Sequence, residues 1–596
     1  MSLKFDPDDS LLNSSWATVL LSERDVAGQV PINFVTTSAI SLQAACFGGN
    51  KFARSAAEKC LSNLLAVGYR RFNIDIYWSP ELWRWILCPV SIPQGVHVVT
   101  APSGATPTTT AEVAEGTVTA QSGDSSGDLL NILGPYRCSD GLDLSGLLGI
   151  FRDYFQQTDT DLVIDLRYLS LNLHVAADST SADEPATSVA SAQLPTGSDR
   201  VSSILDDKLG SYIYDLSDLL KDRRNLNDSW YAVEDAYKPI TEYFTIEKDM
   251  EGVQSTPDGW PSAKYIQSAA ERRLLVEYGS VDPQLDSYSL SAENQVIFPP
   301  MYLTSTVPVS AADDGSLDSG CIFDPRETDI SAVNASWAVS SHIPLPRNLS
   351  NELSLSYISD LVVNLTACGI TSTLNNTIFN DTADDDPGSY RNLTLSSSWA
   401  WDLGQPSAPL NDLDSAEPSD ERCAIMDLSQ GHWRTANCSN TRLAACRINN
   451  QPFRWAVSSD PYSYRDAYDH ACSEGSSFSV PRTGLENTYL FRYLLSQSTD
   501  LIDPASSDSL KREVWIDFNS LDTETCWVTG GPEETCPYTS DPDQLERRTV
   551  LVAAIAGIVI CIIAALTLFV KCNANRRNSR RNRRIIQGWE YEGVPS

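Results

Sequence analysis

The stretch RRFNIDIYW, residues 70–78, decides the fold. Apolar residues such as Phe72 and Ile74 alternate in it with polar residues such as Asp75. Strict alternation over this length predicts a β-strand with one buried face. The segment just before it, FARSAAEKCLSNLLAVG (52–68), has the apolar spacing of a helix. A helix that leads into a strand is the repeating unit of an α/β domain.

The same unit recurs over the next 200 residues. LSGLLGIFRDYFQQ (144–157) predicts a helix, LVIDLRYL (162–169) predicts the strand that follows it, and RRLLVEYG (272–279) predicts a third strand. Strands that alternate with helices favour a parallel sheet, and the simplest such fold of this size is a barrel.

Each of the three predicted strands carries an acidic residue. In a barrel the carboxyl ends of the strands meet at one rim, where the active site lies. Carboxylates gathered there can act as an acid–base pair or hold a divalent cation. The alternative is a structural role, in which Arg167 or backbone amides satisfy them. The candidates are Asp75, Asp165 and Glu277.

A long apolar segment lies near the carboxyl terminus. Thr549 to Val570 holds 22 residues without a charge, and a helix rising about 1.5 Å per residue would span the roughly 30 Å hydrocarbon core of a membrane. A buried helix in a soluble domain is the alternative, but such helices rarely lack a polar face over this length. We therefore predict one transmembrane helix at 549–570.

Charges on the two sides of this helix predict its orientation. Residues 571–596 form a basic tail with a formal charge of +5, which the positive-inside rule places in the cytoplasm. Residues 1–548 would then be lumenal or extracellular, as in a single-pass type I membrane protein. The whole chain carries −35, so residues 1–570 carry −40. This acidity argues against a nucleic-acid partner, because binding to phosphates needs cations.

The amino-terminal residues 1–16, MSLKFDPDDSLLNSSW, show no signal peptide, because they lack a basic start and an apolar stretch. Either the natural start lies further upstream, or the protein is tail-anchored with its bulk in the cytosol. Tail anchoring would carry seven basic residues across the membrane and leave twelve cysteines in a reducing compartment. We prefer the first reading.

The cysteines before the predicted span are even in number and contain no C-x-x-C pair, and histidines are few. This pattern is typical of disulfides rather than of zinc ligands. The twelve residues are Cys46, Cys60, Cys88, Cys138, Cys321, Cys368, Cys423, Cys438, Cys446, Cys472, Cys526 and Cys536.

The same region holds nine N-x-S/T sequons, six of them between residues 334 and 392. In a lumenal or extracellular protein such a cluster predicts N-linked glycans. The asparagines are Asn13, Asn227, Asn334, Asn348, Asn364, Asn375, Asn380, Asn392 and Asn437.

Composition suggests how the chain is divided. Residues 1–330 hold the predicted barrel, with Ser/Thr/Ala-rich inserts near 100–128 and 176–200 that we expect to be disordered. Residues 331–398 are predicted to be a glycosylated, β-rich connecting region, and residues 399–540 a second, disulfide-rich α+β domain.

Several long blocks closely resemble one known family. They are WATVLLSERDVAGQVPINFVTTSAISLQAACFG (16–48), CLSNLLAVGYRRFNIDIYW (60–78) and GWPSAKYIQSAAERRLLVEYG (259–279), and the family is the fungal maintenance of telomere capping protein 6 family. The first half of that family resembles phospholipase-C-like phosphodiesterases, which implies a distorted TIM barrel. The resemblance also implies an indirect role in telomere capping.

Those phosphodiesterases use a pair of histidines, the first of which follows the first strand in a Thr-His-Asn-Ser-like run. The corresponding stretch here, PINFVTTSAISLQ (31–43), has no histidine. Acid–base catalysis would then need carboxylates with shifted pKa values. We therefore expect a barrel that has lost its catalysis. The histidines of the chain are His97, His174, His342, His432 and His470.

The second domain resembles a C-type lectin-like domain in swapped order. WAWDLGQP (399–406) and RCAIMDLSQGHWRTANCSNTRLAACR (422–447) resemble its end, and the segment from residue 453 resembles its beginning. It is either a permuted domain or two partial modules. The resemblance implies the pairs Cys423–Cys438 and Cys446–Cys472, and a short loop closed by Cys526 and Cys536.

Calcium-dependent sugar binding would need oxygen ligands after the turn proline and after the tryptophan. The sequence places Ser407, Arg434 and Thr435 there instead, so we expect no calcium-mediated lectin activity.

The sequence thus favours a non-catalytic membrane glycoprotein of the secretory pathway, which binds or scaffolds a glycan or protein ligand in the lumen without a cofactor or metal. One alternative is a metal-dependent phosphodiesterase or hydrolase that acts on lipid or glycan headgroups. Another is a calcium-independent glycan-binding protein.

Overall fold

The computed structural model describes most of the chain before the predicted span. The described residues are 3–12, 17–93, 97–101, 117–122, 128–160, 162–312, 315–343, 351–406 and 421–538. The predicted transmembrane helix at 549–570 and the tail at 571–596 lie outside these ranges. Within them, we find no helix with the length and apolar character needed to cross a membrane. Residues 1–534 form one compact unit, which is described below.

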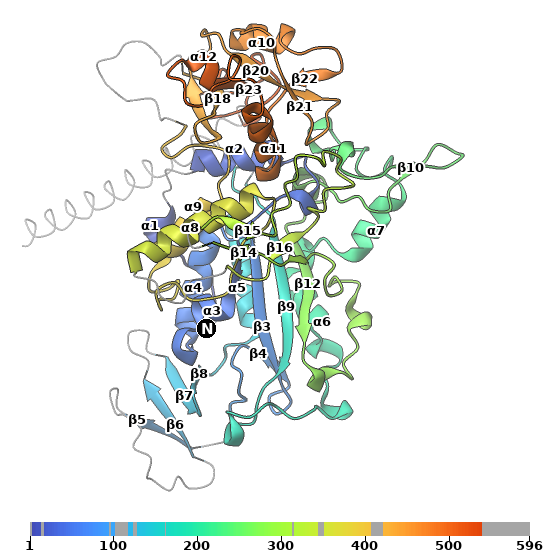
Figure 1. Ribbon diagram of the computed structural model, residues 1–596. Coiled ribbons are helices and arrows are strands. Elements are labelled where there is room, and N and C mark those ends of the chain that lie inside the picture. Colours follow the sequence, from blue (N-terminus) through green and yellow to red (C-terminus); the bar gives the residue numbers. More distant parts are fainter. Residues whose placement is uncertain are drawn as a thin grey trace, which may run out of the picture. The chain divides into compact units, whose positions relative to one another are not determined.

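A parallel sheet lies at the centre of this unit (Figure 1). Its strand order is β12–β9–β3–β1–β17, and each neighbouring pair is parallel. A sixth strand, β4 (Arg84–Ile86), pairs antiparallel with β3. The strands on the main path are β1 (Ala39–Ser41), β3 (Arg71–Ser79), β9 (Arg167–Val175), β12 (Leu274–Val281) and β17 (Thr373–Leu374). The sheet is an open, partial barrel of mixed α/β type.

The predicted helices cover one face of this sheet. α4 (Arg54–Ala66) precedes β3, and α5 (Leu144–Gln157) precedes β9, as the sequence predicts. Phe72 of β3 and Phe151 of α5 meet edge to face, with ring centroids 5.5 Å apart. The alternating apolar residues of the strands thus bury against helices, which is the main source of stability in such a layer.

The segment 176–200, predicted to be disordered, is an ordered connection. Two indole N–H groups from the sheet hold its backbone: Trp78 donates to the Gln193 carbonyl at 2.8 Å, and Trp85 donates to the Asp199 carbonyl at 3.0 Å. Every residue has a backbone carbonyl, so the Ser/Ala-rich sequence gives no sign of these contacts. The insert near 100–128 also contains a described strand, β6 (Thr117–Ser122), which pairs with β7 (Leu129–Leu133).

Residues 331–398 differ from the predicted β-rich connecting region. They contain two helices, α8 (Asn351–Ala367) and α9 (Pro387–Ser396), and short strands. One of those strands, β17, pairs with β1 through Ala39 and Thr373. The barrel sheet therefore extends beyond residue 330, because its edge is completed by a strand distant in sequence.

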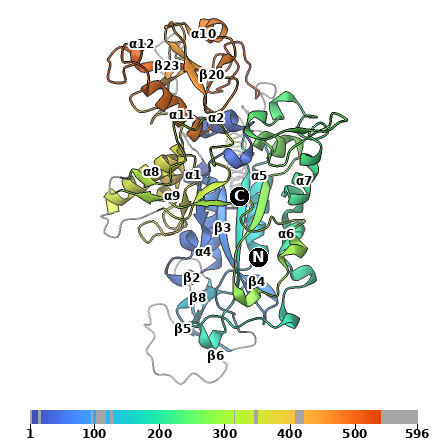
Figure 2. The ribbon, with the colours of Figure 1, turned by 45° about the vertical axis from the view of Figure 1, so that its right-hand side comes forward.

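The region after residue 399 has its own sheet, of order β19–β18–β23–β20–β21 with β22 on β20. Helices α10 (Tyr464–His470) and α11 (Gly484–Leu495) lie in the same region as this sheet (Figure 2). The strands are β18 (Cys423–Asp427), β19 (His432–Ala436), β20 (Leu443–Ile448), β21 (Trp455–Val457), β22 (Ser476–Phe478) and β23 (Glu513–Asn519).

This second sheet region is tied to the amino-terminal helix α2 (Ala17–Ala27). The Glu23 carboxylate accepts hydrogen bonds from the Ser398 hydroxyl at 2.6 Å and from the Trp399 and Ala400 amides at 3.0 and 2.9 Å. Burial raises the pKa of Glu23 despite these bonds. A buried carboxylate with three donors fixes the two segments to each other.

Disulfides close loops throughout the unit. Cys423–Cys438 and Cys446–Cys472 are the pairs that the lectin-like resemblance implies. Cys526, and Cys536 beyond the end of this unit, are also disulfide-bonded. Further disulfides are Cys46–Cys60, Cys88–Cys138 and Cys321–Cys368.

Candidate functional site

The face of the central sheet that is turned away from α4 and α5 carries polar side chains. Asp75 pairs in register with Asn172, and two residues further along Tyr77 pairs with His174. Asn172 donates a hydrogen bond of 2.7 Å to Asp75. Paired residues of parallel strands point to the same face, so these four side chains lie together. Asp282, directly after β12, completes the group, which we call the His174 array.

His174 is the centre of this array. Its Nδ1 lies 3.0 Å from Asp282 Oδ2, its Nε2 lies 3.7 Å from Asp75 Oδ1, and its ring stacks on Tyr77 with centroids 4.9 Å apart. The side chain of His174 is 21% exposed and that of Asp282 is 37% exposed. The array is therefore accessible to a ligand.

The charges of the array act on one another. Burial alone would lower the pKa of His174, but Asp75 and Asp282 outweigh it and raise the pKa above 6.5. Burial would raise the pKa of Asp75, but the approach of His174 and the hydrogen bond from Asn172 outweigh it and lower the pKa below 3.8. Burial and the two carboxylates raise the pKa of Tyr77. The ionised forms of Asp75 and His174 are thus favoured together.

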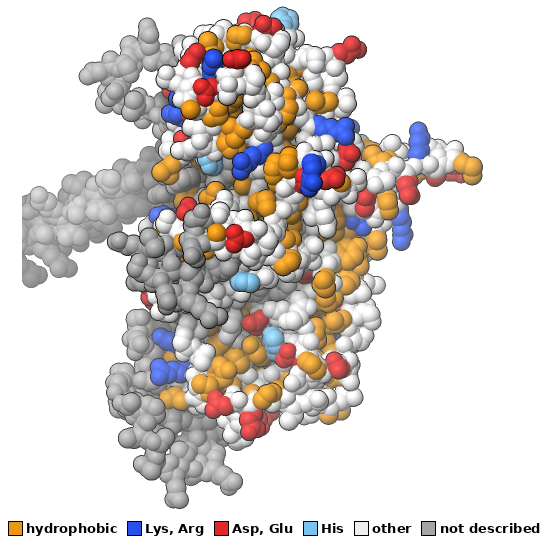
Figure 3. Space-filling model, viewed as in Figure 1, with side chains coloured by type: hydrophobic (Ala, Val, Ile, Leu, Met, Phe, Trp, Pro, Cys, Tyr) orange, Lys and Arg blue, Asp and Glu red, His pale blue; other side chains and the backbone are white. Residues whose placement is uncertain are grey.

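The array is poor in cations other than the histidine. In the described part of the chain, its ion pairs and hydrogen bonds involve no lysine or arginine. On the face seen in Figure 3, basic side chains do not gather into one patch. Two carboxylates and one imidazolium leave a net negative site, which repels phosphate groups and favours neutral or basic ones.

Asp165 does not lie at the predicted rim. β9 begins at Arg167, so Asp165 comes before the amino end of the strand, far along the strand from His174. It lies 2.6 Å from Arg167 and 3.5 Å from Arg273, and the Tyr154 hydroxyl donates to it. Burial raises its pKa, but the arginines outweigh burial and lower it. These contacts are those of the structural alternative considered for these acids.

Glu277 is also not at the rim. It pairs with Ser170 in the middle of β12 and is only 1% exposed. Its carboxylate lies 2.9 Å from the Arg71 guanidinium and accepts a 2.9 Å hydrogen bond from the Leu303 amide. The three predicted acids therefore do not share a rim, and only Asp75 belongs to an accessible site.

Sequence reasoning missed His174, Asn172 and Asp282. The predicted strand at 162–169 began five residues too early, which placed its end before the polar residues of the actual strand. The signal that would have found them is the alternation within RYLSLNLHV (167–175), where every second residue from Ser170 onward is polar.

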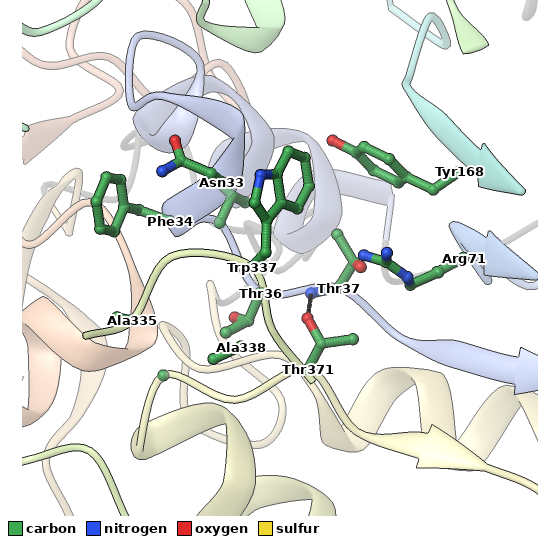
Figure 4. Close-up of a pocket in the computed structure, with 12 residues that line it drawn as sticks. Asn33, Phe34, Thr36, Thr37, Arg71, Tyr168, Ala335, Trp337, Ala338 and Thr371 are labelled. Atoms are coloured by element: carbon green, nitrogen blue, oxygen red, sulfur yellow. Dashed lines mark hydrogen bonds between the residues drawn. The ribbon is translucent and has the colours of Figure 1, made fainter. Parts of the chain in front are cut away.

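A small pocket lies at the opposite, amino end of the strands (Figure 4). Its walls include Arg71, Tyr168 and Trp337. The Arg71 guanidinium lies beside both rings, 5.7 Å from the Tyr168 centroid and 5.9 Å from the Trp337 centroid, and the two rings meet edge to face 5.8 Å apart. The Arg71–Glu277 pair separates this pocket from the His174 array along the strands.

The positions that would hold calcium in a lectin-like domain are engaged in protein contacts. Gln405 Oε1 accepts hydrogen bonds of 3.1 Å from both the amide and the hydroxyl of Thr435. The Arg434 guanidinium lies 3.1 Å from Asp427 and 4.0 Å from Asp402. Ser407 lies outside the described residues. Over the described ranges, no group of three or more His, Cys, Asp or Glu residues is placed to hold a metal.

Most of the sequons that the structure describes are accessible. Asn364 and Asn437 are partly buried, and Asn364 donates to the Gly315 carbonyl at 2.8 Å. Asn13 and Asn348 lie outside the described residues. The exposed asparagines are Asn227, Asn334, Asn375, Asn380 and Asn392.

Comparison with known proteins gives the family. Residues 11–395, more than half of the chain, match a family model described as the MTC6 partial TIM-barrel domain. The chain belongs to this family. A Candida albicans (strain WO-1) relative named "Maintenance of telomere capping protein 6" is 22% identical over 98% of this chain and 95% of its own length.

Two further relatives carry the same printed name. The protein of Yarrowia lipolytica is 26% identical over 96% of this chain and 90% of its own length. That of Saccharomyces cerevisiae (strain YJM789) is 27% identical over 66% of this chain and 66% of its own length. No solved structure matches the chain. The open parallel sheet is thus the partial barrel of the maintenance of telomere capping protein 6 family.

Proposed function

We propose that this chain is a non-catalytic membrane glycoprotein of the secretory pathway, whose partial barrel binds a lumenal ligand at the His174 array. The observation that carries the proposal is the placement of His174, with one ring nitrogen 3.0 Å from Asp282 and the other facing Asp75. An imidazole held between two carboxylates is favoured in its protonated form, and a protonated imidazole has no lone pair for general-base catalysis.

The charge of the array also disfavours the enzyme alternative. Cleavage of a phosphodiester builds negative charge, which enzymes stabilise with Lys, Arg or a metal ion. Hydrolysis of a glycoside needs one carboxyl group with a raised pKa, whereas the pKa of Asp75 is lowered. A neutral or basic partner, a glycan or a protein, suits the array better than a substrate with phosphate.

The membrane and glycan parts of this proposal rest on the sequence and the disulfides. The apolar segment 549–570 and the basic tail favour a type I orientation. Disulfides spread over the whole unit favour an oxidising compartment. The exposed sequons would be modified there. The family name suggests a contribution to telomere capping, which in a lumenal, acidic protein would be indirect.

Substitutions at the array test whether it is functional. The double variant Asp75→Asn, His174→Gln keeps the shapes of the side chains and removes their chemistry. The variant Ser280→Trp instead adds bulk at an exposed residue whose hydroxyl donates to Asn172 at 3.0 Å. Each would be expressed in a strain that lacks this protein, at normal protein level, with Asp140→Asn as the exposed control.

If the array binds the ligand, both variants fail to rescue the strain, because the double variant removes the charges of the site and the bulky variant blocks access to it. Full rescue by both would show that the array has no role. Endoglycosidase treatment of the native protein tests the compartment separately, because unchanged mobility would contradict the lumenal placement.

A further inference from the structure

The strand β12 contains one extra residue opposite Asn172. β12 pairs with β9 in regular register as far as Tyr278, and the pairing resumes at Val281 one residue out of step. Gly279 and Ser280 therefore share a single partner position, that of Asn172. Such an insertion is a β-bulge, and bulges next to functional sites often re-aim a side chain.

The bulge decides which side chain after β12 reaches His174. Side chains alternate between the two faces of a strand, so a shift of one residue exchanges the faces. In an unbroken ladder Val281 would pair with His174, and Asp282 would point toward the apolar core. With the extra residue, Val281 pairs with Leu173 and packs against that core. Asp282 then lies 3.0 Å from His174 Nδ1.

The bulge also fixes the side chain of Asn172. Ser280 donates to Asn172 Oδ1 from its amide at 2.8 Å and from its hydroxyl at 3.0 Å. Gly279 leaves room for this arrangement, because a β-carbon there would lie 2.2 Å from Asn172 Oδ1, far inside van der Waals contact. With its oxygen held in this way, Asn172 donates from Nδ2 to Asp75 Oδ1 at 2.7 Å.

Asn172 and His174 approach the same oxygen of Asp75. The Asn172 amide lies at 2.7 Å from it, whereas His174 Nε2 lies at 3.7 Å. The second distance exceeds the roughly 3.2 Å limit of an N–H···O hydrogen bond. Asp75 thus attracts the imidazolium but does not bond to its Nε2–H. A protonated imidazole donates from both nitrogens, so this second donor is left for another acceptor.

We propose that Asn172 is a positioning residue, which holds Asp75 back so that His174 Nε2–H can donate to an uncharged oxygen of the ligand, a hydroxyl or an amide carbonyl. The net negative charge of the array disfavours an anionic acceptor. This inference rests on the function proposed for the array, and it adds the contact through which the ligand is recognised.

NMR titration of the His174 ring in the full-length chain tests the positioning, and His174→Gln identifies its signal among the five histidines. In Asn172→Ala, Asp75 is free to close on Nε2. The ring should then titrate at higher pH than in the wild type, because a nearer carboxylate stabilises the protonated form. The charged and titratable groups that face the ring in the described chain, Asp75, Tyr77 and Asp282, are all kept. A general loss of structure would instead lower the midpoint.

Gly279→Ala is the second variant, because its β-carbon would displace the Asn172 side chain without removing it. It should move the midpoint in the same direction, and it should have no further effect when combined with Asn172→Ala. The matched control is Asn376→Ala, since Asn376 is exposed and follows β17, at the opposite edge of the sheet from β12. It should leave the midpoint unchanged. A midpoint in Asn172→Ala at or below that of the wild type would overturn the proposal.

Rescue of the strain that lacks this protein separates the inference from the function on which it rests. At normal protein level, Asn172→Ala should rescue less well than the wild type, because Asp75 then occupies Nε2–H. If Asn172→Ala rescues fully while the double variant Asp75→Asn, His174→Gln fails, the array is functional but the contact proposed here is wrong. Full rescue by both would refute the function of the array and this inference with it.

Discussion

Arg71 and Glu277 form an ion pair of 2.9 Å across the polar face of the central sheet, and their side chains are only 5% and 2% exposed. The pair joins the start of β3 to the middle of β12, two strands away. A carboxylate that the sequence offered as catalytic therefore holds the barrel together.

Glu277→Gln should destabilise the protein by about 3–5 kcal/mol, because removing one partner of a buried pair leaves an uncompensated charge. Urea denaturation of the purified chain measures this loss. Asp140→Asn is the matched control: Asp140 pairs with Arg84 at 3.1 Å but is 75% exposed, and exposed pairs contribute little. Equal midpoints for the two variants would show that the buried pair is not important for stability.

His174 should titrate above its ordinary pKa of 6.5, because Asp75 and Asp282 stabilise its protonated form. A raised pKa in the folded state adds stability that is complete below the unfolded value and is lost as pH rises through the folded value. NMR titration of the His174 ring measures the shift, and Asp282→Asn should reduce it. A wild-type ring that titrates at or below 6.5 would contradict the ion-paired array.

The region around β23 should become more stable as the pH falls toward 4. Asp517 is buried, and burial raises its pKa to about 6, although the Gly530 and Gly531 amides and the Tyr464 hydroxyl donate to it. A raised carboxyl pKa means that the folded state takes up a proton before the unfolded state does. Stability therefore rises as pH falls from about 6 to the unfolded value of 3.8.

The size of this effect follows from the shift, which corresponds to about 3 kcal/mol between neutral pH and pH 4. Asp517→Asn should flatten the dependence, and thermal unfolding monitored by tryptophan fluorescence over pH 4–8 would measure it. If the stability of the variant depends on pH as steeply as that of the wild type, another group is responsible for the dependence.

The Cys88–Cys138 disulfide should stabilise the fold, since it joins two residues that are 50 positions apart in the chain. Replacing both cysteines with serine is expected to cost about 2–5 kcal/mol, as for other native disulfides. Denaturation of the double variant measures the cost, with wild-type protein kept oxidised. A loss below about 1 kcal/mol would mean that the segment after β4 is held by its other contacts alone.

Local patterns predicted the local structure well. β3 spans Arg71–Ser79 and α5 spans Leu144–Gln157, close to the predicted 70–78 and 144–157. Alternation and helical spacing are properties of neighbouring residues, so the sequence displays them directly. The start of β9 was misplaced because the apolar run LVIDL also suits a strand, whereas β9 begins at Arg167, where its pairing with Leu274 of β12 starts.

The candidate site could not be predicted from the sequence alone, because it combines residues from segments that are distant in the chain. Asp75 was a candidate because its strand was recognised, but its partner His174 lies 99 residues further along the chain, and Asp282 follows a third strand. Register between parallel strands is set by packing of the whole sheet, which no short window of sequence encodes.

The sequence by itself determined the α/β class, the acidic charge, the even set of cysteines and the family to which the chain belongs. Only the tertiary structure decided which acid faces solvent beside a histidine and which are buried against arginines. The reason is physical: all three acids look alike in sequence, and their chemistry is set by the charges and burial that distant strands bring to them.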